Sequence, residues 1–159
     1  TWQPIYDGRR LSPAPPATPV PPPMPTRVRF RLVTPLRLRH QEEYVDPERF
    51  TFSDLFGSLL RRISSLTYFH TNRPLETDFA GLMVTARGTA AEDKDLLWQD
   101  WTRYSSRQQK ELQMGGLTGV FTVRLSGHHE LWPYLWLGQW TYAGKGTSMG
   151  LGRYVMESV

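Results

Sequence analysis

The clearest hydrophobic pattern in the chain follows its proline-rich N-terminus, where apolar and charged residues alternate. Val28, Phe30 and Leu32 are separated by arginines, and this period of two predicts a half-buried β-strand. Pro35 interrupts the alternation, which resumes over residues 36–40. Because proline cannot donate a hydrogen bond within a sheet, we expect one strand with a break or bulge at this position.

Three later stretches have apolar residues three and four positions apart, the spacing of a helix with one buried face. They predict helices over residues 52–66, about 76–86 and 130–142. Thr51 and Asp54 resemble a capping box at the start of the first helix. Pro133 fits the third helix, because proline is tolerated in a first helical turn.

Alternation returns over residues 97–104 and 117–125, with a polar stretch and Gly115-Gly116 between them. These segments predict a β-hairpin, and residues 153–156 predict a final strand. The resulting order of strand, helix, short helix, strand, strand, helix and strand is the split βαβ or ferredoxin-like arrangement. We therefore expect an α+β, ferredoxin-like fold, an antiparallel sheet with its helices on one face. Many unrelated functions use this fold, so topology alone does not identify an activity.

The N-terminal segment differs in composition from the rest of the chain. Nine of the 13 prolines fall within residues 1–26, which predicts an extended, polyproline-like linker or arm. Residues 27–159 are then one domain, because 159 residues leave room for a single core. Since the chain begins with Thr1 rather than Met, we expect that it is processed or that another domain precedes it.

Composition excludes several classes of protein. The chain has no cysteine, which removes disulfides, thiolate nucleophiles and zinc sites of the CxxC type. No stretch approaches the roughly 18 consecutive apolar residues of a membrane span, so we expect no membrane partner and a cytoplasmic location.

The net charge of +4 is modest but unevenly distributed, with residues 27–73 alone contributing +4. Of the 19 basic residues, 16 are arginine, whose planar guanidinium suits phosphate and can stack on bases. This balance favours an anionic polymer as ligand, although a merely solvated basic surface explains the charge equally well.

The segment most suggestive of chemistry is the glycine-rich stretch over residues 144–154. It has four glycines in nine residues, with Lys145, Thr147, Ser148 and Arg153 beside them. Glycines let a ligand approach backbone N–H groups closely, so the stretch predicts a phosphate-binding loop. Its spacing fits neither a P-loop nor a dinucleotide fingerprint. The alternative is a tight connection that binds nothing.

Five segments, taken in order, resemble a known family. They are VRFRLVTPLRLR, FGSLLRRISSL, WQDWTRYSSRQQ, GGLTG and GKGTSMGLGRY. The last is similar to the signature loop of the repeat-associated RNA-binding (RAMP) superfamily of CRISPR systems. The whole set, within residues 27–156, resembles the C-terminal half of the CRISPR precursor-RNA-processing endoribonucleases.

The resemblance implies a function for the full protein. Members of the family usually have two ferredoxin-like domains in tandem and cut repeat RNA without a metal ion or other cofactor. The 2′-hydroxyl attacks the neighbouring phosphate in line and leaves a cyclic phosphate, commonly with a histidine as acid or base. The reacting residues usually sit on the N-terminal domain. The resemblance therefore implies that this chain binds CRISPR repeat RNA and positions it beside an N-terminal RAMP domain of the same protein.

Candidate RNA-binding residues fall into three groups. The first comprises Gly144, Lys145, Gly146, Thr147, Ser148, Gly150, Gly152 and Arg153. The second comprises Arg103, Arg107 and Lys110, where the hairpin connection can reach an RNA backbone or the minor groove of a stem. The third comprises Arg29, Arg31, Arg61 and Arg62.

Two histidines are candidates for acid–base chemistry. Metal-free RNA cleavage needs a group that titrates near neutrality, which makes His40 and His70 the candidate catalytic residues within this chain. Neither histidine has the partners of a metal site, and we expect no bound metal.

Trp132, Trp136 and Trp140 repeat every four residues, and we expect this stripe to dock on the N-terminal domain, because an exposed one would promote aggregation.

Two other functions are compatible with these residues. One is a noncatalytic RAMP subunit that binds guide RNA and assembles with other subunits of a CRISPR effector complex. The other is a small ribonuclease that acts alone through His40 or His70. Cleavage by this chain, abolished by a single histidine substitution, would distinguish the second.

Overall fold

A four-stranded antiparallel sheet forms the centre of the protein. The computed structural model describes residues 6–12, 19–100, 102–105 and 110–159. The sheet has the strand order β4-β7-β1-β8. Its strands are β1 (Arg27–Leu36), β4 (Ala91–Gln99), β7 (Gly116–Arg124) and β8 (Tyr154–Ser158).

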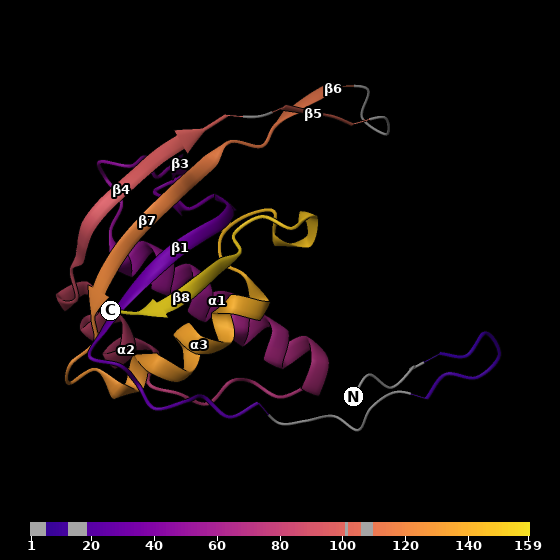
Figure 1. The fold of residues 1–159 in the computed structure, drawn as a ribbon, viewed down its shortest axis with the longest axis horizontal. Coiled ribbons are helices and arrows are strands. Elements are labelled where there is room, and N and C mark those ends of the chain that lie inside the picture. The colour runs from indigo at the N-terminus through magenta and orange to yellow at the C-terminus, as the bar shows by residue number, and fades with distance from the viewer. Residues whose placement is uncertain (1–5, 13–18, 101, 106–109) are drawn as a thin grey trace.

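Three α-helices cover one face of this sheet (Figure 1). They are α1 (Phe52–Thr71), α2 (Phe79–Gly88) and α3 (Trp132–Thr141), with two single 3-10 turns, η1 (His129–Leu131) and η2 (Thr147–Met149). The element order and the antiparallel sheet are those of a ferredoxin-like α+β fold, as the sequence predicts. Within the described residues, no helix combines the length and the apolar character needed to cross a bilayer.

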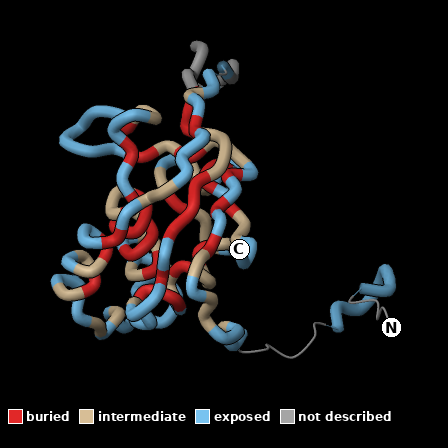
Figure 2. Tube along the Cα trace, turned by 60° about the vertical axis from the view of Figure 1, so that its left-hand side comes forward, coloured by how far each residue is buried: buried red, intermediate tan, exposed pale blue. Residues whose placement is uncertain are grey.

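The core lies between the sheet and the helices, where the buried stretches of the chain gather (Figure 2). Phe30 of β1 stacks on Phe121 of β7 with ring centroids 4.9 Å apart. Phe52 of α1 and Tyr154 of β8 pack against the same Phe30 ring. Burial of such rings supplies much of the stability of a small domain, so the core joins three strands to the first helix.

The first strand matches its predicted pattern up to the proline. Val28, Phe30 and Leu32 are buried while the arginines between them are exposed, and the pairing of β1 with β7 shifts register between Leu32 and Leu36. The predicted bulge at Pro35 is therefore confirmed, since β1 continues to Leu36, which pairs with Leu117. The predicted continuation of the strand is wrong for residues 37–40. The chain instead leaves the sheet and forms the short pair β2 (Arg39–His40) and β3 (Glu43–Tyr44).

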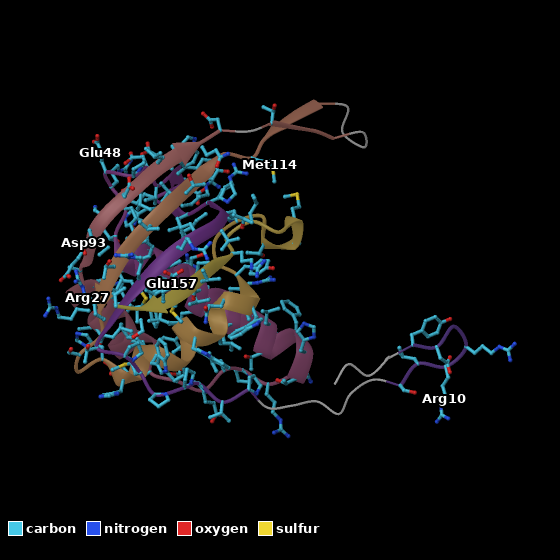
Figure 3. All side chains as sticks on the ribbon, viewed as in Figure 1. Arg10, Arg27, Glu48, Asp93, Met114 and Glu157 are labelled. Atoms are coloured by element: carbon cyan, nitrogen blue, oxygen red, sulfur yellow. The ribbon has the colours of Figure 1, made fainter. Side chains whose placement is uncertain are left out.

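The second sheet strand begins six residues earlier than predicted. Its first half, Ala91–Asp95, is mostly charged, as is common on an edge strand. It shows no hydrophobic alternation, because the register with β7 shifts between Glu92 and Asp95. Charge also anchors this end, since Arg27 Nη2 lies 2.6 Å from Asp93 Oδ2 (Figure 3). The predicted strand over 97–104 therefore consists of the end of β4 and the start of a separate pair.

That separate pair continues the β4–β7 hairpin beyond the sheet. Strands β5 (Thr102–Ser105) and β6 (Lys110–Gln113) pair antiparallel with each other and project past the ends of β4 and β7 (Figure 1). The predicted hairpin is thus confirmed, with an extended two-stranded arm in place of a polar loop.

Helix boundaries follow their capping residues. The capping box at Thr51 and Asp54 is present at the start of α1, which runs five residues beyond the predicted end to a left-handed Asn72. Helix α2 begins after Asp78, whose side chain accepts from Gly81 N–H. Helix α3 carries Pro133 in its first turn, as expected.

The tryptophan stripe on α3 is buried at its first residue and exposed at its last. Trp132 is buried, and its indole N–H donates to the carbonyl of Pro22 at 2.7 Å. Trp136 packs against the core, and Trp140 is 61% exposed. The expected docking of the whole stripe on another domain is therefore wrong for Trp132, because the proline-rich segment of this chain already covers it.

Candidate nucleic-acid interface

The glycine-rich loop is fixed to three other parts of the molecule through its backbone. Lys145 N–H donates to the carbonyl of Arg37 at 2.8 Å, and Gly144 N–H donates to Ser58 Oγ of α1 at 3.0 Å. Gly152 N–H donates to Pro35 at 3.0 Å, and Arg153 N–H to Thr34 Oγ1 at 2.9 Å. The bulge in β1 and the start of α1 thus position the loop.

Two of the glycines are required by close backbone contacts. Gly152 has φ +78°, and a Cβ there would overlap the carbonyl oxygen of Ala143. Gly144 has φ +85°, and a Cβ there would meet the carbonyl oxygen of Arg37. Since positive φ is costly for residues with a side chain, these two glycines let the loop pack tightly on the protein itself. The Cβ positions of these two glycines are thus occupied by the protein's own backbone, and their part in RNA binding stays a prediction.

The same hydrogen bonds reduce the number of N–H groups that a phosphate could use. Among the described residues, the structure assigns internal acceptors to the N–H groups of residues 143–145 and 149–153. Within the part of the chain that the structure describes, the N–H groups of Gly146, Thr147 and Ser148 have no acceptor in the protein. Gly146 is left-handed, and Thr147 and Ser148 begin η2 after it. The predicted backbone phosphate site is thereby reduced to these three consecutive groups.

A basic cleft lies between this loop and helix α1. It has a volume of about 240 Å³ and is lined by Arg37, Arg39, Ser58, Arg61, Arg62, Ser65, Gly144, Lys145 and Thr147. Five of these nine residues are cationic and three carry hydroxyl groups. A concave site with this set of donors suits the phosphates of a polyanion, because every charged or hydroxyl side chain in it can donate a hydrogen bond.

The charge of the cleft is largely unneutralised. Among the described residues, the only carboxylate within ion-pair distance of its cations is Glu42, 3.1 Å from Arg39 Nη1. Arg37 is held by other means, with its guanidinium 4.5 Å from the centre of the Tyr44 ring and Nη1 3.9 Å from Met114 Sδ. Arg62 Nε donates to the carbonyl of Thr141 at 3.3 Å. Clustered like charges repel one another, so the cleft favours the binding of an anion.

A histidine–carboxylate pair adjoins the cleft. His40 Nδ1 lies 3.1 Å from Asp54 Oδ1, with the imidazole half exposed and the carboxylate only 12% exposed. The other carboxylate oxygen accepts from Thr51 in the capping box, so the pair is positioned by the start of α1. A hollow of about 190 Å³ lined by Arg39, His40, Asp54 and Arg61 contacts both groups, and it shares two arginines with the cleft.

Only some of the remaining residues of the first and third predicted groups lie in the cleft. Arg61 and Arg62 join Lys145 and Thr147 in the cleft. Arg153 lies instead beside Gln139, Trp140 and Tyr142 in a separate hollow, and exposed Ser148 does not line the cleft. Arg29 and Arg31 are exposed on β1, where Arg31 pairs with Glu157 at 3.4 Å. The structure therefore does not bring these four residues into one site with Lys145.

The second predicted group belongs to the projecting arm. Arg103 lies on β5 and Lys110 on β6, while Arg107 lies outside the described residues. Of the other histidines, His70 is exposed in the last turn of α1, and His128 and His129 flank the start of η1. Only His40 is placed beside the cleft.

Sequence reasoning missed four cleft residues: Arg37, Arg39, Ser58 and Ser65. No local pattern marks Arg37 and Arg39, because their place in the cleft depends on the bond from Lys145 N–H to the carbonyl of Arg37. Ser58 and Ser65 occupy the same helix face as Arg61 and Arg62, at spacings of three and four. Among the described residues, no three His, Cys, Asp or Glu side chains gather closely enough to hold a metal ion.

Comparison with known families identifies the lineage. The sequence model of the family described as CRISPR-associated endoribonuclease Cas6 matches residues 30–154, which is most of the chain. The chain belongs to the Cas6 family. A comparison with curated protein sequences gives no significant match.

Solved Cas6 structures have the same fold at low sequence identity. A Cas6 product complex matches with 21% identity and a TM-score of 0.57, covering 86% of this chain and 53% of the other. Thermus thermophilus Cas6 matches with 21% identity and a TM-score of 0.61, covering 85% and 55%. A Cas6-RT-Cas1–Cas2 complex matches with 19% identity and a TM-score of 0.60, covering 86% and 14%. The chain thus spans about half the length of the Cas6 proteins it resembles.

Proposed function

We propose that this chain is the RNA-binding, C-terminal domain of a Cas6 endoribonuclease and that it positions precursor crRNA for cleavage. In this proposal residues 27–159 form the domain and residues 1–26 form a linker or arm. The observation that carries it is the basic cleft, in a chain of the Cas6 family that spans about half the length of the matched structures. The catalytic residues then lie on a preceding N-terminal domain.

The cleft supports binding of a phosphate backbone more than base readout. Arginine guanidinium groups can hold phosphate oxygens through two parallel hydrogen bonds, and Arg61 and Arg62 present two such groups on one helix. Lys145 adds a third charge from the opposite wall. Binding of this kind positions a nucleic acid without selecting its sequence, which suits a domain that holds RNA beside a separate reactive centre.

The proposed reaction needs no metal ion. In cleavage by a 2′-hydroxyl, a base removes the hydroxyl proton and an acid protonates the leaving 5′-oxygen, while cations stabilise the phosphorane. In this proposal those groups come from the N-terminal domain, and the cleft holds the RNA backbone beside that reactive centre. The His40–Asp54 pair gives a specific reason to test the second candidate function, a ribonuclease that acts alone.

A binding and cleavage assay with labelled CRISPR repeat RNA in EDTA tests the proposal. The cleft variant Arg61→Ala/Arg62→Ala is compared with Arg9→Ala/Arg10→Ala, an adjacent pair of exposed arginines that changes the net charge equally. We expect the cleft variant alone to weaken binding and to flatten its salt dependence, because fewer counterions are released. Equal losses in both variants would contradict a specific cleft.

The cleavage measured in the same assay distinguishes the candidate functions. Binding without cleavage by this chain is the expected result. Metal-free cleavage that is lost in His40→Ala would establish the ribonuclease that acts alone. No RNA binding at low salt would leave the assembly role, in which the chain contacts other subunits of a CRISPR effector complex.

A further inference from the structure

Two aromatic side chains extend the basic face of α1 without joining the core. Phe69 is 81% exposed and Tyr68 is 50% exposed. Their rings contact each other edge to face, with centroids 5.6 Å apart. A single exposed aromatic residue is ordinary on a protein surface, so the adjacent pair is informative only through its position.

The position follows from helical geometry. Tyr68 is seven residues after Arg61, and Phe69 is seven residues after Arg62, so each aromatic lies about two turns along the same helix face as an arginine of the cleft. Ser65, also in the cleft, lies between them. Seven residues correspond to roughly 10 Å along a helix axis, a short distance beyond the end of the cleft.

The charge along this face is of one sign. The only acidic residue of α1 is Asp54 in its first turn, and residues 55–71 contain no aspartate or glutamate. A polyanion that leaves the cleft along α1 therefore meets cations, hydroxyl groups and aromatic rings, with no carboxylate on the helix to repel it. A cationic groove followed by exposed aromatic side chains is the arrangement by which proteins bind single-stranded nucleic acid.

We infer that Phe69 and Tyr68 form a stacking platform for an unpaired base of the RNA whose phosphates occupy the basic cleft. The inference rests on the proposed function and adds the form of the substrate. A base inside a duplex has both faces covered by its neighbours, so the platform requires a single-stranded nucleotide beside the bound backbone. The recognised RNA is then one with an unpaired segment next to the phosphates held by Arg61 and Arg62.

The platform predicts a loss of base-dependent affinity without a loss of phosphate contacts. Binding by the full chain is measured with a labelled, unstructured, adenine-rich RNA and with an abasic strand of equal length. The variants are Phe69→Ala, the conservative Phe69→Tyr, and Val84→Ala as a control at a residue of α2 that is 65% exposed.

Phe69→Ala should weaken binding of the adenine-rich RNA by about 5- to 100-fold, the usual cost of removing one stacking aromatic. Its affinity for the abasic strand and the salt dependence of binding should be unchanged, because no phosphate contact is removed. Phe69→Tyr should retain binding, and Val84→Ala should have no effect.

Failure of the platform is distinguishable from failure of the cleft. If Phe69→Ala leaves binding unchanged while Arg61→Ala/Arg62→Ala weakens it, the platform is refuted and the proposed function stands. If Phe69→Ala weakens both strands equally, or instead disrupts association with another protein, the stacking role is likewise refuted. If neither variant affects RNA binding, the proposed function fails as well.

Discussion

The two walls of the basic cleft are built in opposite ways. The glycine-rich loop is held by its backbone, with N–H groups bound to Pro35, Arg37, Ser58 and Thr34. Helix α1 satisfies its backbone internally and directs the side chains of Arg61, Arg62 and Ser65 to the cleft. The loop that looks most functional in the sequence is therefore largely architectural, and the helix that looks like a core element supplies two of the five cations of the cleft.

Because the two walls differ in this way, we expect substitutions in them to affect different properties, namely fold stability and RNA binding. Substitutions of loop residues whose backbones touch other segments should destabilise the fold. Substitutions of exposed cleft side chains such as Arg61 and Lys145 should change RNA affinity and leave the fold intact, because surface changes away from packed or strained positions are usually nearly neutral.

The largest effect is expected for Gly152→Ala. The new Cβ would overlap the carbonyl oxygen of Ala143 at a φ of +78°, so we expect a loss of at least about 3 kcal/mol in the free energy of unfolding. The melting temperature should fall by roughly 6–12 °C. Gly88→Ala is the control, because its Cβ would have no neighbour within 4 Å. Equal stability of the two variants would show that the close backbone contact is not required.

Thr34→Val tests the side chain that ties the loop to the β1 bulge. Thr34 Oγ1 accepts from Arg153 N–H at 2.9 Å and donates to the carbonyl of Gly150 at 2.8 Å. Losing both bonds should cost about 1–2 kcal/mol, measured by urea denaturation. Thr34→Ser keeps the hydroxyl and should retain most of that stability. A valine variant as stable as the native chain would contradict the architectural role of this contact.

Lys145→Ala tests the loop side chain that faces the cleft. Its backbone N–H bond to Arg37 is kept, so the melting temperature should not change. RNA affinity should fall by roughly 3- to 10-fold at moderate salt, and the slope of log K against log salt should decrease by about 0.7 for single-stranded RNA. An unchanged affinity and slope would remove Lys145 from the interface.

Arg153→Ala should have the smallest effect. Although Arg153 belongs to the glycine-rich motif, its side chain lies in a separate hollow beside Trp140 and Tyr142. We expect RNA affinity within about twofold of the native value, since a cation outside the contact region releases no counterion. A loss as large as that of Lys145→Ala would show that the RNA path extends beyond the cleft.

Prediction from sequence succeeded where the pattern was local and strongly periodic. The buried face of β1, the Thr51–Asp54 capping box and the Pro133 turn of α3 are confirmed. It failed at Ala91–Asp95, because a register shift between Glu92 and Asp95 interrupts the period of two in this edge strand. It also failed at residues 37–40, where apolar alternation continues although the chain leaves the sheet after Leu36.

The sequence predicted only those residues of the candidate site that belong to a local pattern. Lys145 and Thr147 were selected from the glycine-rich motif, and Arg61 and Arg62 from their helix. Nothing local in the sequence places Arg37 and Arg39 opposite these residues, because the contact depends on a loop that reaches back over more than 100 residues to bind the carbonyl of Arg37.

The sequence by itself determined the order of elements, the core faces and the Cas6 family, because hydrophobic periodicity and the five segments that resemble the family are properties of neighbouring residues. Only the tertiary structure decided which polar groups remain free for a ligand. Backbone bonding occupies most N–H groups of the glycine-rich loop, and packing brings five cations from three segments into one cleft. Such placement depends on contacts between residues distant in sequence, which no local pattern records.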